Sequence, residues 1–223
     1  MLAIVGMAIL AKLLAMHGKA MENHIIQAIV FDAFGTLVKI GEGRRPYRQL
    51  MQLAKASGRT PQTDDARHIM TKTLGFSRLA DWLGVDLSSI QSAFEHDIAT
   101  ELASIVLYPD SLTTLETLKQ RGLKLAICSN LAAPYGLPVK KLLPDLDAYF
   151  FSYEMEALKP DPEIYAQICD ELKLLPDQIL FVGDTYEADV TGPRKAGMQA
   201  LHLARSGNSP EGQAALRSLD ELV

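Results

Sequence analysis

The chain has 223 residues, of which 48% are hydrophobic, and this is enough to form a full hydrophobic core together with a second small unit. Its net charge of −5 and its pI near 5.5 argue against a nucleic-acid or anionic-membrane surface, because phosphate groups select basic patches. The two cysteines, Cys128 and Cys169, lie in apolar stretches without metal-ligand spacing. They predict buried thiols in a reducing compartment, so we expect a cytoplasmic protein that acts on small molecules.

The first 20 residues are apolar and are interrupted by Lys12. They have no basic start, and their apolar run is shorter than the roughly 18 to 20 residues that cross a bilayer, so they do not predict a membrane anchor. A secretory signal is the alternative, because Ala-rich signal sequences have this appearance. We interpret residues 1–24 as an N-terminal extension, or as sequence upstream of a start at Met21, because the domain pattern begins only at Ile25.

Residues 25–38, IIQAIVFDAFGTLV, join a run of β-branched and aromatic residues to a break at Gly35 and Thr36. This pattern predicts a buried parallel strand that ends at Asp32 and leads into a tight turn. Ligands bind at the carboxyl ends of the strands in an open α/β sheet, so Asp32 lies where chemistry is expected. From its position alone, a turn or helix-capping role is the simpler explanation of Asp32, and it is other parts of the chain that favour chemistry.

The segment after this strand has helical rather than strand periodicity. It predicts four helices, at residues 46–56, 63–74, 76–83 and 87–106. No strand pattern separates them, so we interpret residues 43–106 as an all-helical cap. The cap is inserted into a core that is formed by residues 25–42 and 107–223.

Helices and strands alternate in the rest of the chain. Helices are predicted at residues 111–120, 137–143, 162–174 and 187–196, and strands at residues 123–129, 148–152, 179–182 and 200–203. Strands that alternate with helices of this length predict an α/β fold with a doubly wound parallel sheet.

Polar side chains stand at the ends of several of these core segments. They are Asp32 with Thr36, Ser129 with Asn130, Lys159, and Asp184 with Asp189. Parallel strands would bring these ends to one edge of the sheet, where three carboxylates in one pocket would repel each other. Lys159 would supply one positive charge and a divalent cation the rest, and oxygen-only ligands favour Mg²⁺. The expected partner is a small anionic substrate.

The motifs FDAFGTLV, ICSN, LKPDPEIY and FVGDTYEADVTGPRKAGM, in this order, resemble those of the haloacid dehalogenase-like hydrolase superfamily. The resemblance extends over residues 25–203 and implies a Rossmann-like core with a helical cap after the first motif. It implies that Asp32 is a nucleophile that forms a covalent aspartyl intermediate. Ser129 and Lys159 would hold the transferring group, with Thr36 and Asn130 in supporting positions.

The same resemblance implies a magnesium site. The ion would be held by Asp32, the backbone carbonyl of Phe34 and Asp184, with Asp189 supporting the site. One position departs from the pattern, because the superfamily's phosphatases usually have a second Asp, as general acid and base, where this chain has Phe34. General acid–base catalysis contributes roughly 10²- to 10⁴-fold, so Phe34 disfavours an ordinary alkyl phosphomonoesterase unless another group serves.

The first and last motifs favour different reactions. An aromatic residue at position 34 resembles the L-2-haloacid dehalogenases, whose halide leaving group needs no proton. Those enzymes work without metal and lack a counterpart of Asp184, whereas GDTYEAD here is the metal-binding form. Because desolvated carboxylates are costly, we predict Mg²⁺-dependent hydrolysis of a small phosphorylated metabolite, for example an acyl phosphate. Metal-independent dehalogenation is one alternative, and a binding or regulatory protein without turnover is another.

The predicted cap offers weaker candidates. Arg44, Arg45 and Arg48 follow the turn beside Asp32 and could meet a substrate anion at the entrance, although a solvated basic face is the simpler explanation of them. None of the histidines stands near two other potential ligands, so we assign them no role. We expect a monomer or a homodimer whose cap determines the substrate.

Overall fold

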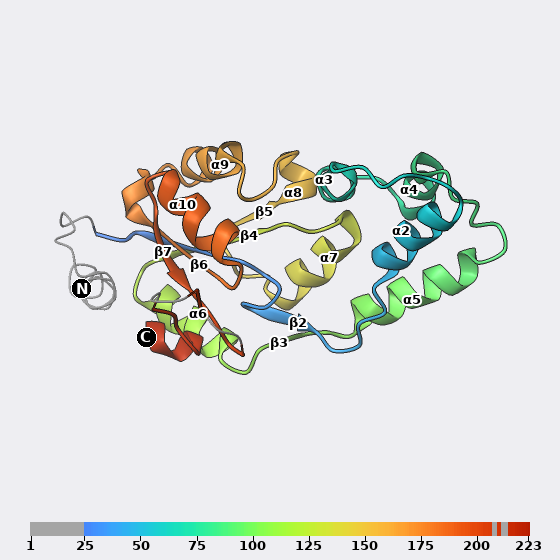
Figure 1. Cartoon of the computed structure of the whole chain (residues 1–223). Coiled ribbons are helices and arrows are strands. Elements are labelled where there is room, and N and C mark those ends of the chain that lie inside the picture. Colours follow the sequence, from blue (N-terminus) through green and yellow to red (C-terminus); the bar gives the residue numbers. More distant parts are fainter. Residues whose placement is uncertain (1–24, 207–208, 211–213) are drawn as a thin grey trace.

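The computed structural model describes residues 25–206, 209–210 and 214–223. The predicted N-terminal extension, residues 1–24, lies outside the described residues. Within the described part of the chain, no helix is long and apolar enough to cross a membrane. The molecule consists of a core that contains a sheet and of a group of helices that projects from one end of this core (Figure 1).

The core is built on a five-stranded sheet in the order β5-β4-β1-β6-β7. Its strands are β1 (Ala28–Phe31), β4 (Lys124–Ser129), β5 (Ala148–Phe151), β6 (Ile179–Gly183) and β7 (Gln199–His202), and every neighbouring pair is parallel. The predicted doubly wound parallel sheet is therefore confirmed. The strand order reverses at β1, the central strand, and such switch points are where α/β sheets bind ligands.

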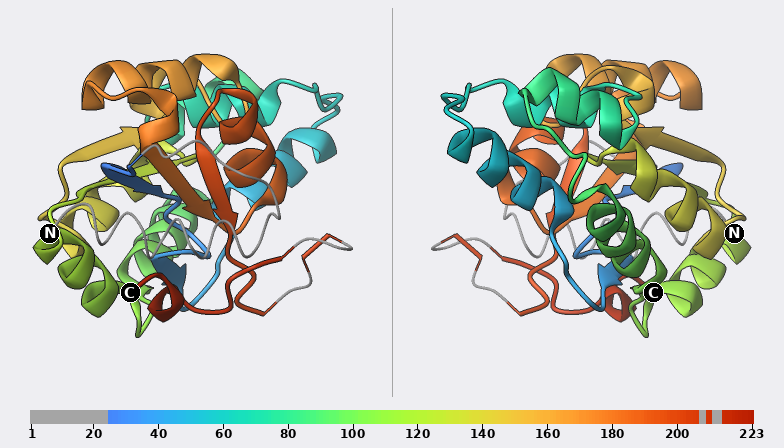
Figure 2. Two further views of the ribbon diagram at one scale, coloured as in Figure 1. Left: turned by 90° about the vertical axis from the view of Figure 1, so that its left-hand side faces the viewer. Right: turned by 90° about the vertical axis from the view of Figure 1, so that its right-hand side faces the viewer.

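Helices cover both faces of the sheet. One face carries α6 (Ser111–Gln120), α7 (Ala133–Leu142) and η3 (Leu219–Leu222), and the other carries α9 (Pro162–Leu172), η2 (Tyr186–Thr191) and α10 (Gly192–Lys195). Figure 2 shows the sheet between α9 above and α6 below. Two short elements, α8 (Ser152–Met155) and η1 (Pro176–Gln178), lie in the connections of this core.

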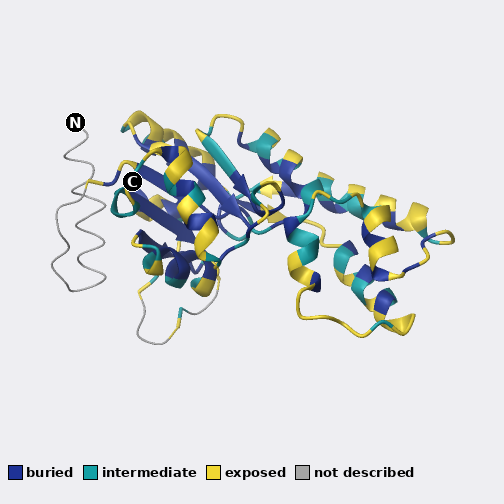
Figure 3. Ribbon diagram, turned by 90° about the horizontal axis from the view of Figure 1, so that it is seen from above, coloured by how far each residue is buried: buried dark blue, intermediate teal, exposed yellow. Residues whose placement is uncertain are grey.

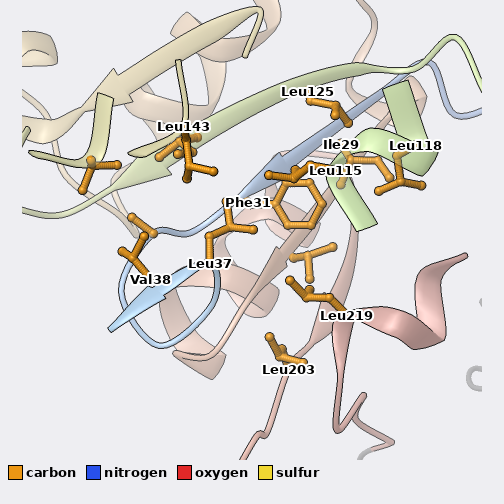
Figure 4. Close-up of a cluster of buried hydrophobic side chains, with 14 of the residues drawn as sticks. Ile29, Phe31, Leu37, Val38, Leu115, Leu118, Leu125, Leu143, Leu203 and Leu219 are labelled. Carbon is orange, nitrogen blue, oxygen red and sulfur yellow. The ribbon is translucent and has the colours of Figure 1, made fainter. Parts of the chain in front are cut away.

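The side chains of β1 point alternately to the two faces of the sheet, which explains why helices cover both faces. Ile29 and Phe31 point into one hydrophobic cluster, where they pack with Leu115 and Leu118 of α6 (Figure 4). Their neighbours in β1 point into the second cluster, against α9. Successive side chains of a strand face opposite sides, so a strand that is apolar at every position must be buried on both.

The helical insertion lies between two short strands. β2 (Val38–Ile40) and β3 (Ile105–Leu107) pair in antiparallel fashion and form a narrow connection between the core and the insertion. Beyond them come α2 (Pro46–Ala56), α3 (Asp65–Thr71), α4 (Phe76–Leu83) and α5 (Gln91–Ala103). The insertion has a hydrophobic cluster of its own, which includes Leu50, Leu83 and Phe94. Figure 3 shows buried positions among the exposed ones in these helices.

Some predicted element boundaries are wrong. The helix predicted for residues 87–106 ends at Ala103, because the β-branched Ile105 and Val106 continue as β3. The helix predicted at residues 137–143 begins earlier, at Ala133, where Pro134 occupies the first turn and has no intrahelical bond to lose. The helix predicted at residues 187–196 is divided into the π-helix η2 and the short α10 at Pro193.

The insertion also contacts the core away from its connecting strands. The Arg67 guanidinium of α3 lies 2.6 Å from the Asp161 carboxylate, two residues after Lys159. The Ser152 hydroxyl donates a hydrogen bond of 2.6 Å to the carbonyl of Met70. These contacts hold α3 over the edge of the sheet at which the strands end.

Candidate active site

Asp32 lies directly after β1, at the centre of the sheet edge. Its backbone N–H donates to the carbonyl of Val182 in β6 at 2.9 Å, so the residue is fixed to the neighbouring strand. The chain then turns sharply, with the N–H groups of Leu37 and Val38 both donating to the carbonyl of Ala33. The Asp32 side chain is 10% exposed, so it is buried but not fully enclosed.

Lys159 joins two of the three predicted carboxylates. Its Nζ lies 2.8 Å from Oδ1 of Asp32 and 2.6 Å from Oδ1 of Asp189, and all three residues are buried. The backbone of Lys159 is held by Asn130, whose Oδ1 accepts from the Lys159 N–H at 2.8 Å. The Asn130 amide in turn donates to the Lys159 carbonyl at 2.7 Å. Asn130 therefore fixes the position from which the ammonium group reaches Asp32.

Asp184 completes the acidic cluster. Carboxylate oxygens of Asp32, Asp184 and Asp189 all lie within 4.8 Å of one another. The Asp189 carboxylate also accepts from the backbone N–H of Thr185 at 2.9 Å, whereas the Asp184 carboxylate accepts a longer bond of 3.3 Å from the Thr185 hydroxyl. Asp184 is thus the carboxylate with least compensation inside the cluster.

Two glycines allow this close approach. Gly35 has φ of +84°, and a Cβ added there would lie 2.1 Å from Oδ2 of Asp184. A Cβ on Gly183 would lie 2.3 Å from the carboxyl carbon of Asp189. Larger residues at either place would displace a carboxylate from the cluster, and at Gly35 they would also meet an unfavourable backbone conformation.

Burial and charge shift the ionisation of the cluster. Desolvation raises the pKa of Asp32 to about 6, and the nearby Lys159 only partly opposes this. Burial would lower the pKa of Lys159, but the adjacent Asp189 and Asp32 outweigh it and raise the pKa instead. Burial and Asp189 raise the pKa of Asp184. Lys159 thus stays charged, while three carboxylates compete for its single charge.

These residues fit a magnesium ion. Three carboxylates with one ammonium group leave an excess of negative charge that a divalent cation would offset. The donor set is oxygen only, which Mg²⁺ prefers over softer nitrogen or sulfur ligands. Asp184 has few other partners and lies nearest to solvent of the three, so it is the side chain best placed to turn toward an ion.

Two further predicted residues are buried around Asp32. Ser129 ends β4, beside β1, and is 2% exposed. Thr36 is fully buried, and its hydroxyl has no hydrogen-bond partner among the described residues. The Thr36 carbonyl, in contrast, accepts from the Arg205 guanidinium at 2.7 Å. A buried hydroxyl without a partner is costly.

Phe34, two residues after Asp32, lines a cavity of about 370 Å³ between the core and the insertion. Its ring packs edge-on against that of Tyr135 in α7, with the centroids 5.9 Å apart. Of the three arginines considered from the sequence, Arg48 lines this cavity. Arg44 instead pairs with Glu42, and Arg45 has φ of +55° at the start of α2.

One residue of the site has no sequence-based assignment. His202 ends β7, and its Nε2 lies 3.0 Å from the carbonyl oxygen of Asp184. Its Nδ1 lies 3.0 Å from the hydroxyl of Ser209. His202 therefore holds the backbone next to the acidic cluster. In the sequence, His202 is recognisable only as a residue of the strand predicted at residues 200–203, which gives no signal for a role in the site.

Comparisons with known proteins agree with this geometry. The model of the haloacid dehalogenase-like hydrolases matches residues 26–197. (S)-2-haloacid dehalogenase 4A of Burkholderia cepacia is 28% identical over 218 residues, which cover 88% of this chain and 93% of that protein. Glyceraldehyde 3-phosphate phosphatase of Methanopyrus kandleri is 30% identical over 171 residues, or 71% of this chain and 66% of that protein.

A solved structure extends the comparison to the fold. The crystal structure of a HAD phosphatase from Thermococcus onnurineus superposes with a TM-score of 0.63 at 24% identity, and the match covers 88% of this chain and 96% of that one. The chain therefore belongs to the haloacid dehalogenase-like hydrolases. Its relatives include both haloacid dehalogenases and phosphatases, so membership of the family does not decide between the two reactions.

Proposed function

We propose that the protein is a Mg²⁺-dependent hydrolase that removes a phosphoryl group from a small anionic metabolite through an aspartyl intermediate on Asp32. The observation that carries this proposal is the clustering of Asp32, Asp184 and Asp189 around a single Lys159. A metal-free reaction would gain nothing from Asp184, whose carboxylate adds repulsion to a largely buried group of charges. With a divalent cation the same carboxylate becomes a ligand.

Each group has a definite part in the proposed reaction. An Asp32 oxygen attacks phosphorus, the bond from phosphorus to the leaving oxygen breaks, and its electron pair departs with that oxygen. Water then adds to phosphorus, the bond to Asp32 breaks, and the protons of the water leave with inorganic phosphate. Lys159 and Ser129 hold the phosphoryl oxygens, and Asp189 keeps Lys159 in place. Mg²⁺ bound by Asp32, Asp184 and the Phe34 carbonyl would neutralise charge on the transferring group.

Phe34 restricts the leaving group. A phenyl ring cannot give a proton to the departing oxygen, so a substrate whose leaving group is stable as an anion is favoured. Acyl phosphates meet this condition, because a carboxylate departs without protonation. The Phe34 ring is held against Tyr135, whose hydroxyl donates at 2.5 Å to the buried Glu101 and so is not directed to a substrate.

Haloacid dehalogenation is the second candidate. It is supported by Phe34, by the apolar walls of the adjoining cavity, and by the similarity to a haloacid dehalogenase along most of the chain. In that reaction Asp32 would displace halide from carbon, and water would then hydrolyse the resulting ester. This reaction needs neither a proton for the leaving group nor a metal. It therefore gives the Asp184 carboxylate no role as a metal ligand.

One paired assay separates the candidates. Phosphate release from acyl phosphates and phosphomonoesters is measured with Mg²⁺ and with EDTA, and halide release from L-2-chloropropionate is measured under the same two conditions. We expect phosphate release that EDTA abolishes and that falls at least about 10³-fold in Asp32→Asn, which lacks the nucleophile. Halide release that is indifferent to EDTA would establish the second candidate instead. Absence of both activities would favour a binding or regulatory protein.

A further inference from the structure

We propose that the substrate carries an apolar acyl group that binds in the cavity beside Phe34, so that the preferred substrates are acyl phosphates with longer aliphatic or aromatic acyl groups. This inference rests on the proposed phosphoryl hydrolysis and specifies its substrate class. It is carried by the composition, volume and position of the cavity, which are independent of the acidic cluster.

The cavity lies where the body of a substrate would extend from Asp32. Its core side is formed by residues that follow β1 and β4, the two strands that end in Asp32 and Ser129, and its other side by α2 and α3 of the insertion. Its volume of about 370 Å³ is at the lower end of the range of roughly 300–1,000 Å³ that small-molecule sites occupy. A group larger than a phosphate therefore fits into it.

Apolar side chains form most of the wall. They include Phe34, Met51, Ile69, Met70 and Leu131. Among the described residues that line the cavity, Arg48 alone carries a charge, and because it is exposed its guanidinium can remain in water while its aliphatic part faces inward. A polar sugar or glycerol body would lose its hydration here without finding equivalent partners.

Of the three uncharged polar side chains of the wall, Tyr47, Asn130 and Tyr135, the last two already have hydrogen-bond partners. The Asn130 amide is bonded at both ends to the backbone of Lys159. The Tyr135 hydroxyl donates to Oε1 of Glu101. Glu101 is 3% exposed and also accepts from the N–H of Arg45 at 2.5 Å. Both oxygens of the buried Glu101 carboxylate therefore already accept hydrogen bonds from the protein. The polar atoms of Asn130 and Tyr135 thus hold the wall together rather than select a polar substrate.

The experiment compares acyl phosphates that differ only in the acyl group. Wild-type kcat/KM is measured with Mg²⁺ for acetyl, propionyl, butyryl and benzoyl phosphate, and the hydrolysis that persists in Asp32→Asn is subtracted. Burial of each added methylene should raise kcat/KM about fourfold, as expected from apolar transfer. Benzoyl phosphate should be the best substrate of the series.

A filled cavity provides the second part of the test. Ala66 of α3 lines the cavity and is exposed, so Ala66→Phe places a ring in the cavity without disturbing a core. We expect this variant to lower kcat/KM for benzoyl phosphate at least about tenfold, the effect of a blocked apolar pocket, with acetyl phosphate little changed. Ala93→Phe is the matched control, because Ala93 is equally exposed on α5 but does not line the cavity.

The outcomes distinguish the two proposals. Equal kcat/KM for all four acyl phosphates, or equal effects of Ala66→Phe and Ala93→Phe, would overturn the apolar substrate class and leave phosphoryl hydrolysis standing. Absence of any Asp32-dependent hydrolysis in the whole series would overturn both. A rise in kcat/KM with acyl size that Ala66→Phe removes, and Ala93→Phe does not, would support both.

Discussion

The two sides of the candidate active site differ in almost every physical respect. The floor, which is formed by Asp32, Lys159, Asp184 and Asp189, is charged, and three of its four residues are at most 7% exposed. The roof, which is formed by the cavity-lining residues of α2 and α3, is mostly apolar and belongs to helices with their own small core. The floor is fixed by strand ends, whereas the roof is attached through β2, β3 and a few side-chain contacts.

Because of this difference, the floor and the roof should have separate functions, the floor in the reaction and the roof in the choice of substrate. The charged floor can stabilise charge that develops during group transfer, and its rigidity keeps those groups in place before the reaction begins. The roof can only distinguish the rest of the substrate, by shape and by apolar contact. Relatives with different reactions and substrates can therefore share this architecture, and variants on the two sides should fail in different ways.

The largest effect is expected from removal of the positive charge in the floor. Lys159→Met leaves Asp32 and Asp189 buried without their ammonium partner. Breaking a buried ion pair from one side typically costs about 3–5 kcal/mol, so the free energy of unfolding should fall by about this amount at pH 7 in EDTA. Urea unfolding followed by circular dichroism measures the loss, and Mg²⁺ should reduce it.

Lys195→Met is the matched control for this variant. Lys195 also pairs with a carboxylate, at 3.8 Å from Glu187, but both side chains are largely exposed. Exposed pairs contribute little, so its unfolding curve should coincide with that of the wild type. Similar losses of unfolding free energy in the two variants would mean that the buried ion pairs of Lys159 with Asp32 and Asp189 contribute no more than an exposed ion pair.

The next effect is expected from an acid in the turn after β1, where the core side of the cavity meets the floor. Phe34→Asp places a carboxyl group two residues after Asp32, where it could protonate a leaving oxygen. We expect kcat/KM for alkyl phosphomonoesters to rise by about 10²- to 10⁴-fold, the usual contribution of general acid–base catalysis. Steady-state phosphate release measures this, and Phe34→Leu should bring no gain. No gain in Phe34→Asp would show that the missing acid is not what limits these substrates.

The floor was predictable from sequence because its chemistry is local to strand ends. Asp32, Lys159, Asp184 and Asp189 each lie in a short motif that follows or adjoins a buried segment, and parallel strands bring such ends together. The role of His202 could not be predicted, because a single histidine at a strand end is not part of a recognisable motif. Its contact with the Asp184 carbonyl depends on β7 lying beside β6, which one sequence does not state.

The roof was predictable only as a set of helices. The bounds of α2 and α4 agree with periodicity, but the pairing of β2 with β3 joins segments more than 60 residues apart and leaves no local signal. The same holds for the cavity, which combines side chains from α2, α3, α7 and the turn after β1. Arg44, Arg45 and Arg48 are close in sequence, yet of these three only Arg48 lines the cavity.

A third prediction concerns pH and again involves the floor. Burial raises the pKa of Asp32 to about 6, so between pH 4 and 6 the metal-free folded state keeps a proton that the unfolded chain has lost. The stability that this proton contributes is present below about pH 4 and is lost as the pH rises through 6. Relative to the wild type, Asp32→Asn should therefore gain on the order of 3 kcal/mol in unfolding free energy between pH 4 and pH 7.

The other titrating residues are common to both proteins, so the comparison reports the proton of Asp32 together with its effect on the charged groups around it. Urea unfolding in EDTA at pH 4, 5, 6 and 7 measures the difference between the two curves. A difference that is independent of pH would mean that Asp32 titrates normally. The floor would then be better hydrated than its burial indicates.

The smallest effect is expected where the roof touches the core. Arg67 and Asp161 form an ion pair at 2.6 Å, but the two side chains are 48% and 24% exposed. Exposed pairs are worth about 0.2–1 kcal/mol, which corresponds to a change of up to about fivefold. Arg67→Ala should raise KM by no more than this and leave kcat nearly unchanged, because the loss affects closure of the roof and not the floor.

Salt provides the control for this last prediction, since ions screen exposed charges. Wild-type KM should rise toward that of Arg67→Ala as NaCl is added, while KM of the variant should respond less. Lys72→Ala is the matched variant, because Lys72 pairs with Glu156 at the same edge, at 3.4 Å, with side chains 44% and 70% exposed. It should leave KM unchanged. If Lys72→Ala matched Arg67→Ala, the effect would reflect net charge at the entrance rather than a contact that holds the roof.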